Sequence, residues 1–328
     1  VVDCTPQVRE LASQYFFIRI WAAPATLGLM AFKGWFIGMQ DSVSPMATDL
    51  VVNGINILMS IVLAMVMGFA GIAAGTVVAQ YSGLLTAVVI LLVRYRKTTL
   101  MHLDSSELKS VFKGGETRRF FVMNADLYVR SLCFIAIYIG FTVISARYGD
   151  VLLAVSSIMM KLLMIFSYFT DGFAYAGEAL TGRYIGAKDQ PMVRQTVKWT
   201  FVWSMGIALI FMGVYHFGGV LLLKMMTSDV VVVSAAEAFL PWLLLMPVAG
   251  CAAFTWDGIY IGATASKAIR NSMLWAVVGF FAVWLAGLAC GDLAPDVSMH
   301  VLMGAYFAHL LARTIYLSVR YKKDVLYL

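Results

Sequence analysis

Nine long apolar stretches, separated by short polar or charged segments, dominate the hydrophobic pattern of this chain. A helix needs about 20 mostly apolar residues to cross the hydrocarbon core of a bilayer, and each stretch reaches this length. The pattern therefore predicts transmembrane helices at residues 13–40, 46–68, 71–93, 120–146, 151–180, 194–216, 235–263, 270–290 and 297–319.

The last three stretches repeat the first three about 225 residues later. Residues 32–38, FKGWFIG, correspond to residues 256–262, WDGIYIG, at an offset of 224. Residues 93–97, VRYRK, correspond to residues 319–323, VRYKK, at an offset of 226. Duplicated helical halves are typical of secondary transporters, in which two similar lobes rock about a site between them. The repeat therefore favours a transporter.

The composition excludes a soluble domain. Hydrophobic residues make up 61% of the 328 residues and charged residues 13%, whereas soluble domains have roughly 45–50% and 25%. Only helices and closed barrels satisfy their backbone hydrogen bonds inside a bilayer, and these apolar runs are too continuous for the alternating strands of a barrel. We therefore expect an all-α, polytopic membrane protein.

Basic residues gather on one side of the expected membrane. If the loop between the third and fourth helices is cytoplasmic, sixteen basic residues lie on its side and only three on the other. The positive-inside rule then places the C-terminus in the cytoplasm and the N-terminus outside. This topology accounts for the net charge of +6, so the charge does not indicate a nucleic-acid partner. The sixteen are Arg94, Arg96, Lys97, Lys109, Lys113, Arg118, Arg119, Arg183, Lys188, Arg194, Lys198, Lys267, Arg270, Arg320, Lys322 and Lys323.

Nine helices do not divide into two equal lobes. Because helices seven to nine repeat helices one to three, helices four to six should have counterparts before residue 1, over about 110 residues. The chain begins at Val1 without the basic n-region or cleavage site of a signal peptide. We therefore interpret it as the last three quarters of a twelve-helix protein.

The sequence contains no pattern typical of a catalytic or metal site. The four cysteines have no CxxC spacing and the four histidines have no HExxH spacing. No set of residues suggests a nucleophile, a base and an oxyanion hole. We therefore expect neither an enzyme nor a bound metal or cofactor.

Three separated groups of residues resemble one family. They are DGFAYAGEAL at 171–180 with GR at 182–183 and GAKD at 186–189, NAD at 124–126 with RSL at 130–132, and DGIYIGAT at 257–264 with RNSM at 270–273. In this order they resemble the DinF-like branch of the multidrug and toxic compound extrusion (MATE) family. The resemblance extends over essentially the whole chain, from the family's fourth helix to its twelfth.

This resemblance implies a carrier of twelve helices in two pseudo-symmetric six-helix lobes, nine of which are present here. Residues 1–97 would form the second half of the N-lobe, residues 98–119 a cytoplasmic loop between the lobes, and residues 120–328 the complete C-lobe. Such a carrier would export organic cations or other amphipathic compounds against an inward flow of protons or sodium ions.

The resemblance also implies remnants of a cation site in the N-lobe. Asn56 corresponds to an asparagine of the family's fifth helix, and Thr76 to a sixth-helix threonine that can help to coordinate a cation. The acidic residue that often follows the asparagine by four positions is Ser60 in this chain. The loss of this carboxylate removes a charged oxygen ligand and weakens a sodium site.

One face of the helix predicted at 151–180 is polar and aromatic. Its members recur at spacings of four and three and fall within a stripe of about 100°. Because charged side chains within a membrane cost about 2.5–3.5 kcal/mol each, such a stripe should face a protein interior or a wet cavity. We assign it to the central chamber of the C-lobe, as a substrate or ion pathway, or alternatively to a buried lysine–carboxylate network that only fixes packing. The stripe comprises Ser157, Lys161, Met164, Tyr168, Asp171, Tyr175, Glu178 and Gly182.

Equivalent charges precede a GxxxG pair in each repeat, Lys33 before Gly34 and Asp257 before Gly258. The glycine pairs favour close helix packing. Both charges lie about 10 Å from the cytoplasmic face at about 1.5 Å per residue. They could pair across the lobes as a cytoplasmic gate, or each could be neutralised separately within its own lobe or at the interface.

Three further features have mainly structural interpretations. Asp126 and Arg130 are four residues apart, a spacing that predicts an ion pair along one helix. His309 and Arg313 share a helix face, where we expect lobe packing or contact with lipid headgroups, and a proton relay through His309 is a lesser alternative.

Prolines should bend the first and seventh helices, and these are Pro24, Pro241 and Pro247.

The leading functional hypothesis is export of amphipathic, cationic compounds by a monomeric carrier in a bacterial inner membrane. Protons are favoured over sodium because titratable side chains outnumber oxygen-rich cages. The expected partners are the lipid bilayer and small amphipathic organic compounds. Two alternatives remain, a lipid-linked substrate flippase of the same superfamily and a truncated membrane protein that does not transport.

Overall fold

The structure is a computed structural model that describes residues 6–96, 115–289, 291 and 293–326, without the side chains of residues 6–9 and 116. Most of the predicted interlobe loop, residues 98–119, lies outside this range, including Lys109 and Lys113. Its last part was predicted wrongly, because residues 115–119 already belong to a helix.

Every regular element in the described part of the chain is helical, which confirms the all-α prediction. Within these residues the longer helices form nine candidate membrane spans, as predicted. The helices are α1 (Pro6–Arg19), η1 (Ile20–Ala22), α2 (Ala23–Gly38), α3 (Val43–Met67), α4 (Phe69–Arg94), α6 (Gly115–Ala146), α7 (Asp150–Gly186), α8 (Gln190–Met226), α9 (Val230–Glu237), α10 (Leu240–Gly262), α11 (Ser266–Ala289), α12 (Pro295–Tyr321) and the π-helical turn η3 (Lys322–Leu326).

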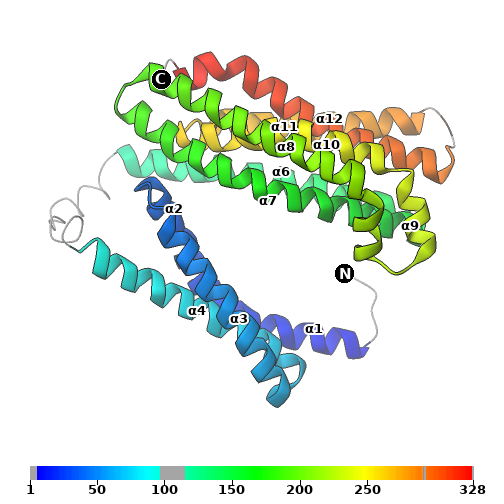
Figure 1. Ribbon diagram of the computed structural model, residues 1–328, viewed down its shortest axis with the longest axis horizontal. Helices are drawn as coiled ribbons and strands as arrows, with labels where there is room; N and C mark the ends of the chain where they lie inside the picture. Colours follow the sequence, from blue (N-terminus) through cyan, green and yellow to red (C-terminus); the bar gives the residue numbers. More distant parts are fainter. Residues whose placement is uncertain (1–5, 97–114, 290, 292, 327–328) are drawn as a thin grey trace. The chain divides into compact units, whose positions relative to one another are not determined.

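The chain divides into two compact units, Val1–Lys113 and Gly114–Leu328. In unit 1, α3 and α4 run side by side as a helical hairpin, and both α1 and α2 pack against α4 (Figure 1). The core of this unit is small and centres on Leu29, Phe36, Val52, Ala79 and Ala87.

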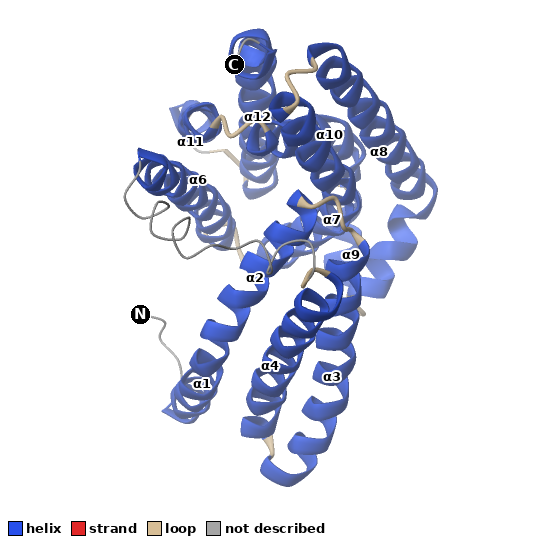
Figure 2. Ribbon diagram, turned by 90° about the vertical axis from the view of Figure 1, so that its left-hand side faces the viewer, coloured by secondary structure: helices blue, strands red, loops and turns tan. Residues whose placement is uncertain are grey.

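Unit 2 buries a larger core. The helices α7, α8 and α10 pack against one another, α6 packs mainly against α11, and α12 contacts both α10 and α11 (Figures 1 and 2). Phe141, Phe166 and Phe280 are almost fully buried among these helices. Large apolar side chains such as Phe217 and Trp275 remain exposed, as expected for helix faces that contact lipid.

Prolines mark the breaks in the first and seventh predicted spans. The first span is interrupted by η1, and Pro24 lies in the first turn of α2. Pro241 lies in the first turn of α10, which begins at Leu240 after the short helix α9. Proline lacks an amide hydrogen and is therefore tolerated at the start of a helix. Pro247 lies inside α10.

Two glycines allow α7 and α10 to approach closely. A Cβ atom on Gly258 would lie 2.2 Å from the carbonyl oxygen of Ala174, and one on Gly262 would lie 2.2 Å from that of Glu178. The expected packing role is therefore observed for the second GxxxG pair. The first pair differs, because a Cβ atom on Gly34 or Gly38 would meet no described atom within 4 Å.

Asp41 connects three helices of unit 1. Its carboxylate accepts hydrogen bonds from the amides of Val43 (3.2 Å) and Ser44 (3.1 Å), from the Ser44 hydroxyl (2.5 Å) and from the Tyr95 hydroxyl (2.7 Å). Arg94 forms an ion pair with it at 3.0 Å. This cluster, in which Asp41 and Ser44 are buried and Arg94 is exposed, ties the turn between α2 and α3 to the end of α4.

These contacts change the acidity of Asp41 and Tyr95, which lie between or beyond the membrane spans. Burial by itself would raise the pKa of Asp41, but the hydrogen bonds from Ser44 and Tyr95 and the Arg94 charge outweigh it and lower the pKa below 3.8. Burial, together with the neighbouring Asp41 carboxylate, raises the pKa of Tyr95.

Gly258→Ala should destabilise unit 2 by about 1–3 kcal/mol, the range for overpacked sites, because the new methyl group would collide with the backbone of α7. Thermal unfolding of the purified protein in detergent measures this loss. Gly34→Ala is the matched control and should leave the melting temperature unchanged or slightly higher. Equal losses in the two variants would contradict the close-packing assignment.

The turn between α2 and α3 should loosen in acid. Because the pKa of Asp41 is lowered on folding, its stabilisation is present above the ordinary pKa of 3.8 and is lost as the pH falls through the lowered value. Hydrogen-exchange protection of the Val43 and Ser44 amides, corrected for intrinsic rates, should fall over this range. Asp41→Asn should show weaker protection with little pH dependence, whereas an unchanged pH response in this variant would exclude Asp41 as the cause.

Candidate functional site

A charged pocket lies in unit 2 among helices that are long enough to span a membrane. Its volume is about 380 Å³, and residues of α6, α7, α10, α11 and α12 line it. All of its charged residues belong to candidate membrane spans, where ionisable side chains are costly and usually functional. These residues are Arg130, Asp171, Glu178, Asp257 and Arg313.

Asp257 forms the centre of this charged group. It is buried on α10, and its Oδ2 atom accepts hydrogen bonds from Arg130 Nη2 at 2.6 Å and from Arg313 Nη2. The Arg313 side chain on α12 is only 2% exposed. Asp257 Oδ1 has no hydrogen-bond partner among the described residues. Two cations on one carboxylate leave a local excess of positive charge beside the pocket.

Two further carboxylates line the pocket from α7. Asp171 and Glu178 are seven residues apart with Tyr175 between them, a spacing that places all three on one helix face. Asp171 and Glu178 are half-buried, and neither has an ion-pair partner within 4.0 Å among the described residues. Arg130 interacts electrostatically with Asp171 as well as with Asp257.

The predicted stripe on α7 is longer than the pocket. Asp171, Tyr175 and Glu178 line the pocket, whereas Ser157, Lys161 and Tyr168 do not. Lys161 is exposed on unit 2 and forms no ion pair with a described carboxylate. The alternative of a buried network between Lys161 and the carboxylates is therefore wrong. Arg130 and Arg313 supply the cations instead.

The predicted ion pair between Asp126 and Arg130 is also wrong. Asp126 is buried and accepts hydrogen bonds from Arg270 Nη1 at 2.6 Å and from the Ser266 hydroxyl at 2.8 Å. Both partners lie at the start of α11, so this contact joins α6 to α11. Arg130 is thereby left to pair with Asp257. The spacing of four residues permitted the local pair, but contacts between helices decided the partners.

His309 and Arg313 pack inside unit 2. Both are almost fully buried, so the alternative of headgroup contact is wrong and the packing alternative is confirmed. His309 Nδ1 lies 2.5 Å from the Tyr306 carbonyl oxygen, while Nε2 has no partner among the described residues. The sequence placed Arg313 on the correct face but did not reveal its pairing with Asp257.

The two charges of the hypothetical gate have partners within their own units. Lys33 forms an ion pair with Asp49 in unit 1. Asp257 is paired with Arg130 and Arg313 in unit 2. This is the separate neutralisation that we considered as the alternative to a gate, and the gate itself stays a prediction.

The N-lobe residues implied by the family resemblance lie together in unit 1. Asn56 Oδ1 accepts hydrogen bonds from the Ser60 hydroxyl at 2.9 Å and from the Thr76 hydroxyl at 3.4 Å. Thr76 also lines a mainly apolar hollow of about 870 Å³ near Phe16, Met30 and Phe69. These side chains supply neutral oxygens, and no carboxylate is part of the Asn56 hydrogen-bond group in the described residues.

The sequence of this chain is similar to one family model and to several known proteins. The family model MatE matches residues 127–285. DNA damage-inducible protein F of Escherichia coli K12 is 32% identical over 322 residues, a match that covers 98% of this chain and 66% of that protein. Protein DETOXIFICATION 42 of Arabidopsis thaliana is 23% identical, covering 96% of this chain and 57% of the plant protein. The chain thus spans just under two thirds of the bacterial relative and less of the plant one.

Solved structures share the fold. The crystal structure of a MATE mutant superimposes with a TM-score of 0.84 at 14% identity, covering 98% of this chain and 72% of that protein. A multidrug resistance MATE family transporter in its outward-facing conformation gives a TM-score of 0.77 at 16% identity, covering 99% of this chain and 72% of that protein.

Asp257→Asn should destabilise unit 2 by about 3–5 kcal/mol, because removing one partner of a buried ion pair leaves an uncompensated charge. Here the stranded charge is that of Arg313. The double variant Asp257→Asn/Arg313→Gln should recover part of this loss, since the fully buried guanidinium is then gone and only the partly exposed Arg130 lacks its partner. Denaturation in detergent measures both values. The Arg313→Gln variant is measured alongside them, and if the double variant lost the sum of the two single losses, the ion pair would not be the source of the effect.

Proposed function

Because this chain belongs to the MATE family of transporters, we propose that it exports amphipathic, cationic organic compounds in exchange for protons. Sodium ions are the second choice of coupling ion. The proposal includes a multi-pass location in a bacterial inner membrane with the C-terminus in the cytoplasm. It concerns the whole protein, and this chain spans 66% of the length of the bacterial DNA damage-inducible protein F.

The charge balance of the unit 2 pocket carries this proposal. Three carboxylates and two arginines line the pocket, so it holds one negative charge when all five groups are ionised. A cationic compound or a proton can neutralise this charge, and the two ligands would then compete. Competition for one charge is a simple way to couple export to an opposing cation flow, because each ligand is released when the other binds.

Asp171 and Glu178 are the residues that we assign to this exchange. Asp257 is held by two guanidinium groups, which stabilise its ionised form. Asp171 and Glu178 lack such a partner within ion-pair distance and can bind a proton without breaking an ion pair. Tyr175, Phe134 and Phe254 line the same pocket, and aromatic rings bind organic cations through their faces.

The same pocket favours an exporter over the lipid-linked flippase. A flippase for anionic lipid-linked substrates needs a strongly cationic groove, whereas carboxylates outnumber arginines in this pocket. Protons are favoured over sodium because the Asn56 group in unit 1 offers only neutral oxygen atoms. Neutral oxygens can bind sodium, a hard cation, but a carboxylate among the ligands strengthens such a site.

Asp171→Asn and Glu178→Gln should each reduce the rate of export by about tenfold, equivalent to an activation barrier about 1.4 kcal/mol higher, because each removes a site for proton exchange. Ethidium efflux from cells that express the complete protein measures the effect. Glu237→Gln, which neutralises an exposed carboxylate outside the pocket, is the matched control and should export normally. Lys161→Gln tests whether the pathway extends along the stripe beyond the pocket.

The coupling ion is tested with purified protein in liposomes. An imposed pH gradient without sodium should drive dye transport by the unchanged protein, and Asp171→Asn should transport the dye about tenfold more slowly. Transport driven only by a sodium gradient would contradict proton coupling, and full transport by both pocket variants would remove the pocket from the pathway.

A further inference from the structure

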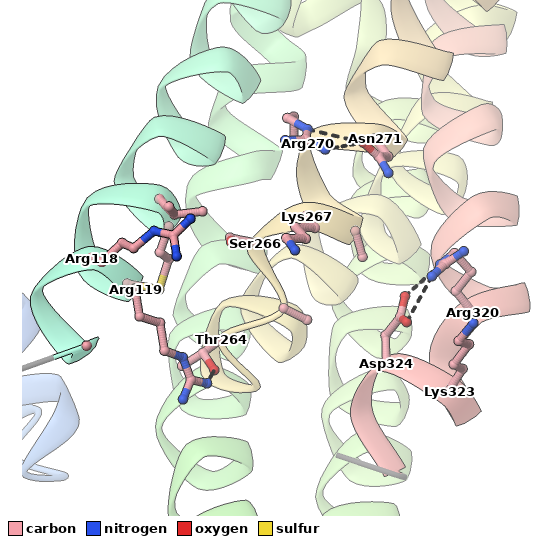
Figure 3. A pocket seen from close by; sticks show the side chains of 15 residues that line it. Arg118, Arg119, Thr264, Ser266, Lys267, Arg270, Asn271, Arg320, Lys323 and Asp324 are labelled. Atoms are coloured by element: carbon pink, nitrogen blue, oxygen red, sulfur yellow. Dashed lines mark hydrogen bonds and ion pairs between the residues drawn. The ribbon is translucent and has the colours of Figure 1, made fainter.

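A second pocket lies at the end of unit 2 where α6 and α11 begin and α12 ends (Figure 3). Its volume is about 740 Å³, and it shares no lining residue with the pocket around Asp257. Six basic side chains line it, contributed by all three helix ends. They are Arg118 and Arg119 from α6, Lys267 and Arg270 from α11, and Arg320 and Lys323 from α12 and η3.

Most of this positive charge is not neutralised by the described residues. Arg320 donates two hydrogen bonds to Asp324, at 2.7 and 3.1 Å, and Arg270 pairs with Asp126. Arg119 donates to the Thr264 hydroxyl at 3.2 Å, which leaves its charge uncompensated. Arg118, Lys267 and Lys323 have no carboxylate partner in the described part of the chain. Four of the six cations therefore remain available to an anion.

The backbone adds to the attraction for anions. Helix α11 is 24 residues long and begins at Ser266, on the pocket wall. The first amides of a helix lack intrahelical acceptors and carry partial positive charge, which favours phosphate and other anions. Thr264, which has a φ of 54°, and Ala265 lead into this helix beside Lys267.

The pocket also has an apolar side that a soluble anion would not need. Val122 and Met123 of α6 line it, and Val122 is 42% exposed. The neighbouring Phe120 and Phe121 are 58% and 66% exposed. The basic residues lie at the ends of three candidate membrane spans, which is the depth of lipid headgroups. An amphiphile with an anionic head and an apolar tail matches this combination.

We propose that this pocket binds the phosphate headgroup of an anionic phospholipid, with an acyl chain along the exposed face of α6. Arg118, Arg119 and Lys267 contact the phosphate, and Arg320 and Lys323 close the pocket from α12. Basic pockets between transmembrane helices are recognised sites for anionic lipid heads. The site is structural or regulatory and does not depend on the export function proposed above.

Binding of short-chain phosphatidylglycerol to the purified protein in detergent, followed by native mass spectrometry, tests this proposal. Phosphatidylglycerol should bind more tightly than phosphatidylcholine of the same chain length. Arg118→Gln/Lys267→Gln should weaken the binding of phosphatidylglycerol about 25-fold, since each basic residue near a headgroup contributes about fivefold. If the double variant cannot be purified in folded form, the two single variants should each bind phosphatidylglycerol about fivefold more weakly.

Arg194→Gln/Lys198→Gln is the matched control, because it removes two cations of α8 that do not line the pocket. It should bind phosphatidylglycerol as the unchanged protein does. An equal loss in this control would reduce the effect to general surface charge and overturn the proposal. Equal affinity for the two lipids would also overturn the proposal. So would displacement of phosphatidylglycerol by inorganic phosphate at the same concentration as the lipid, because the pocket would then bind phosphate without needing the acyl chains.

Discussion

The ion pairs of Asp257 with Arg130 and Arg313 are the interaction on which the candidate site depends. Each charge alone would cost about 2.5–3.5 kcal/mol within a membrane span. Together, the three charges allow α6, α10 and α12 to converge with polar groups facing inward. Asp171 and Glu178 then lie on the wall of a pocket in which two guanidinium groups share one carboxylate, and this net positive charge lowers the cost of two further carboxylates at this depth.

The helices were largely predictable from hydrophobicity, because a helix that crosses the bilayer needs a long apolar run whichever other helices pack against it. The span predicted at 194–216 is the main error in length, since α8 continues to Met226. The breaks near Pro24 and Pro241 were predictable because the covalent ring of proline acts locally. The resemblance to the MATE family, carried by DGFAYAGEAL and DGIYIGAT, matches the comparisons.

The candidate site was predictable only in part. Helical periodicity alone placed Asp171, Tyr175 and Glu178 on one face. It could not show where the pocket ends, so Lys161 was included although it lies outside. Ion-pair partners were harder still, because Asp257 and Arg130 are separated by 127 residues and Asp126 and Arg270 by 144. Such pairs depend on how helices pack, and no pattern within one helix encodes them.

The backbone contact at Gly258 and Gly262 has a mechanical consequence for the pocket. Because α7 and α10 touch through main-chain atoms at these glycines, little compressible side-chain material separates them. The helices that carry Asp171, Glu178 and Asp257 therefore behave as one rigid body with constant spacing between their acidic groups. A change in pocket shape then falls to α6 and α12, which makes the guanidinium groups the movable half of the site and the carboxylates its stationary frame.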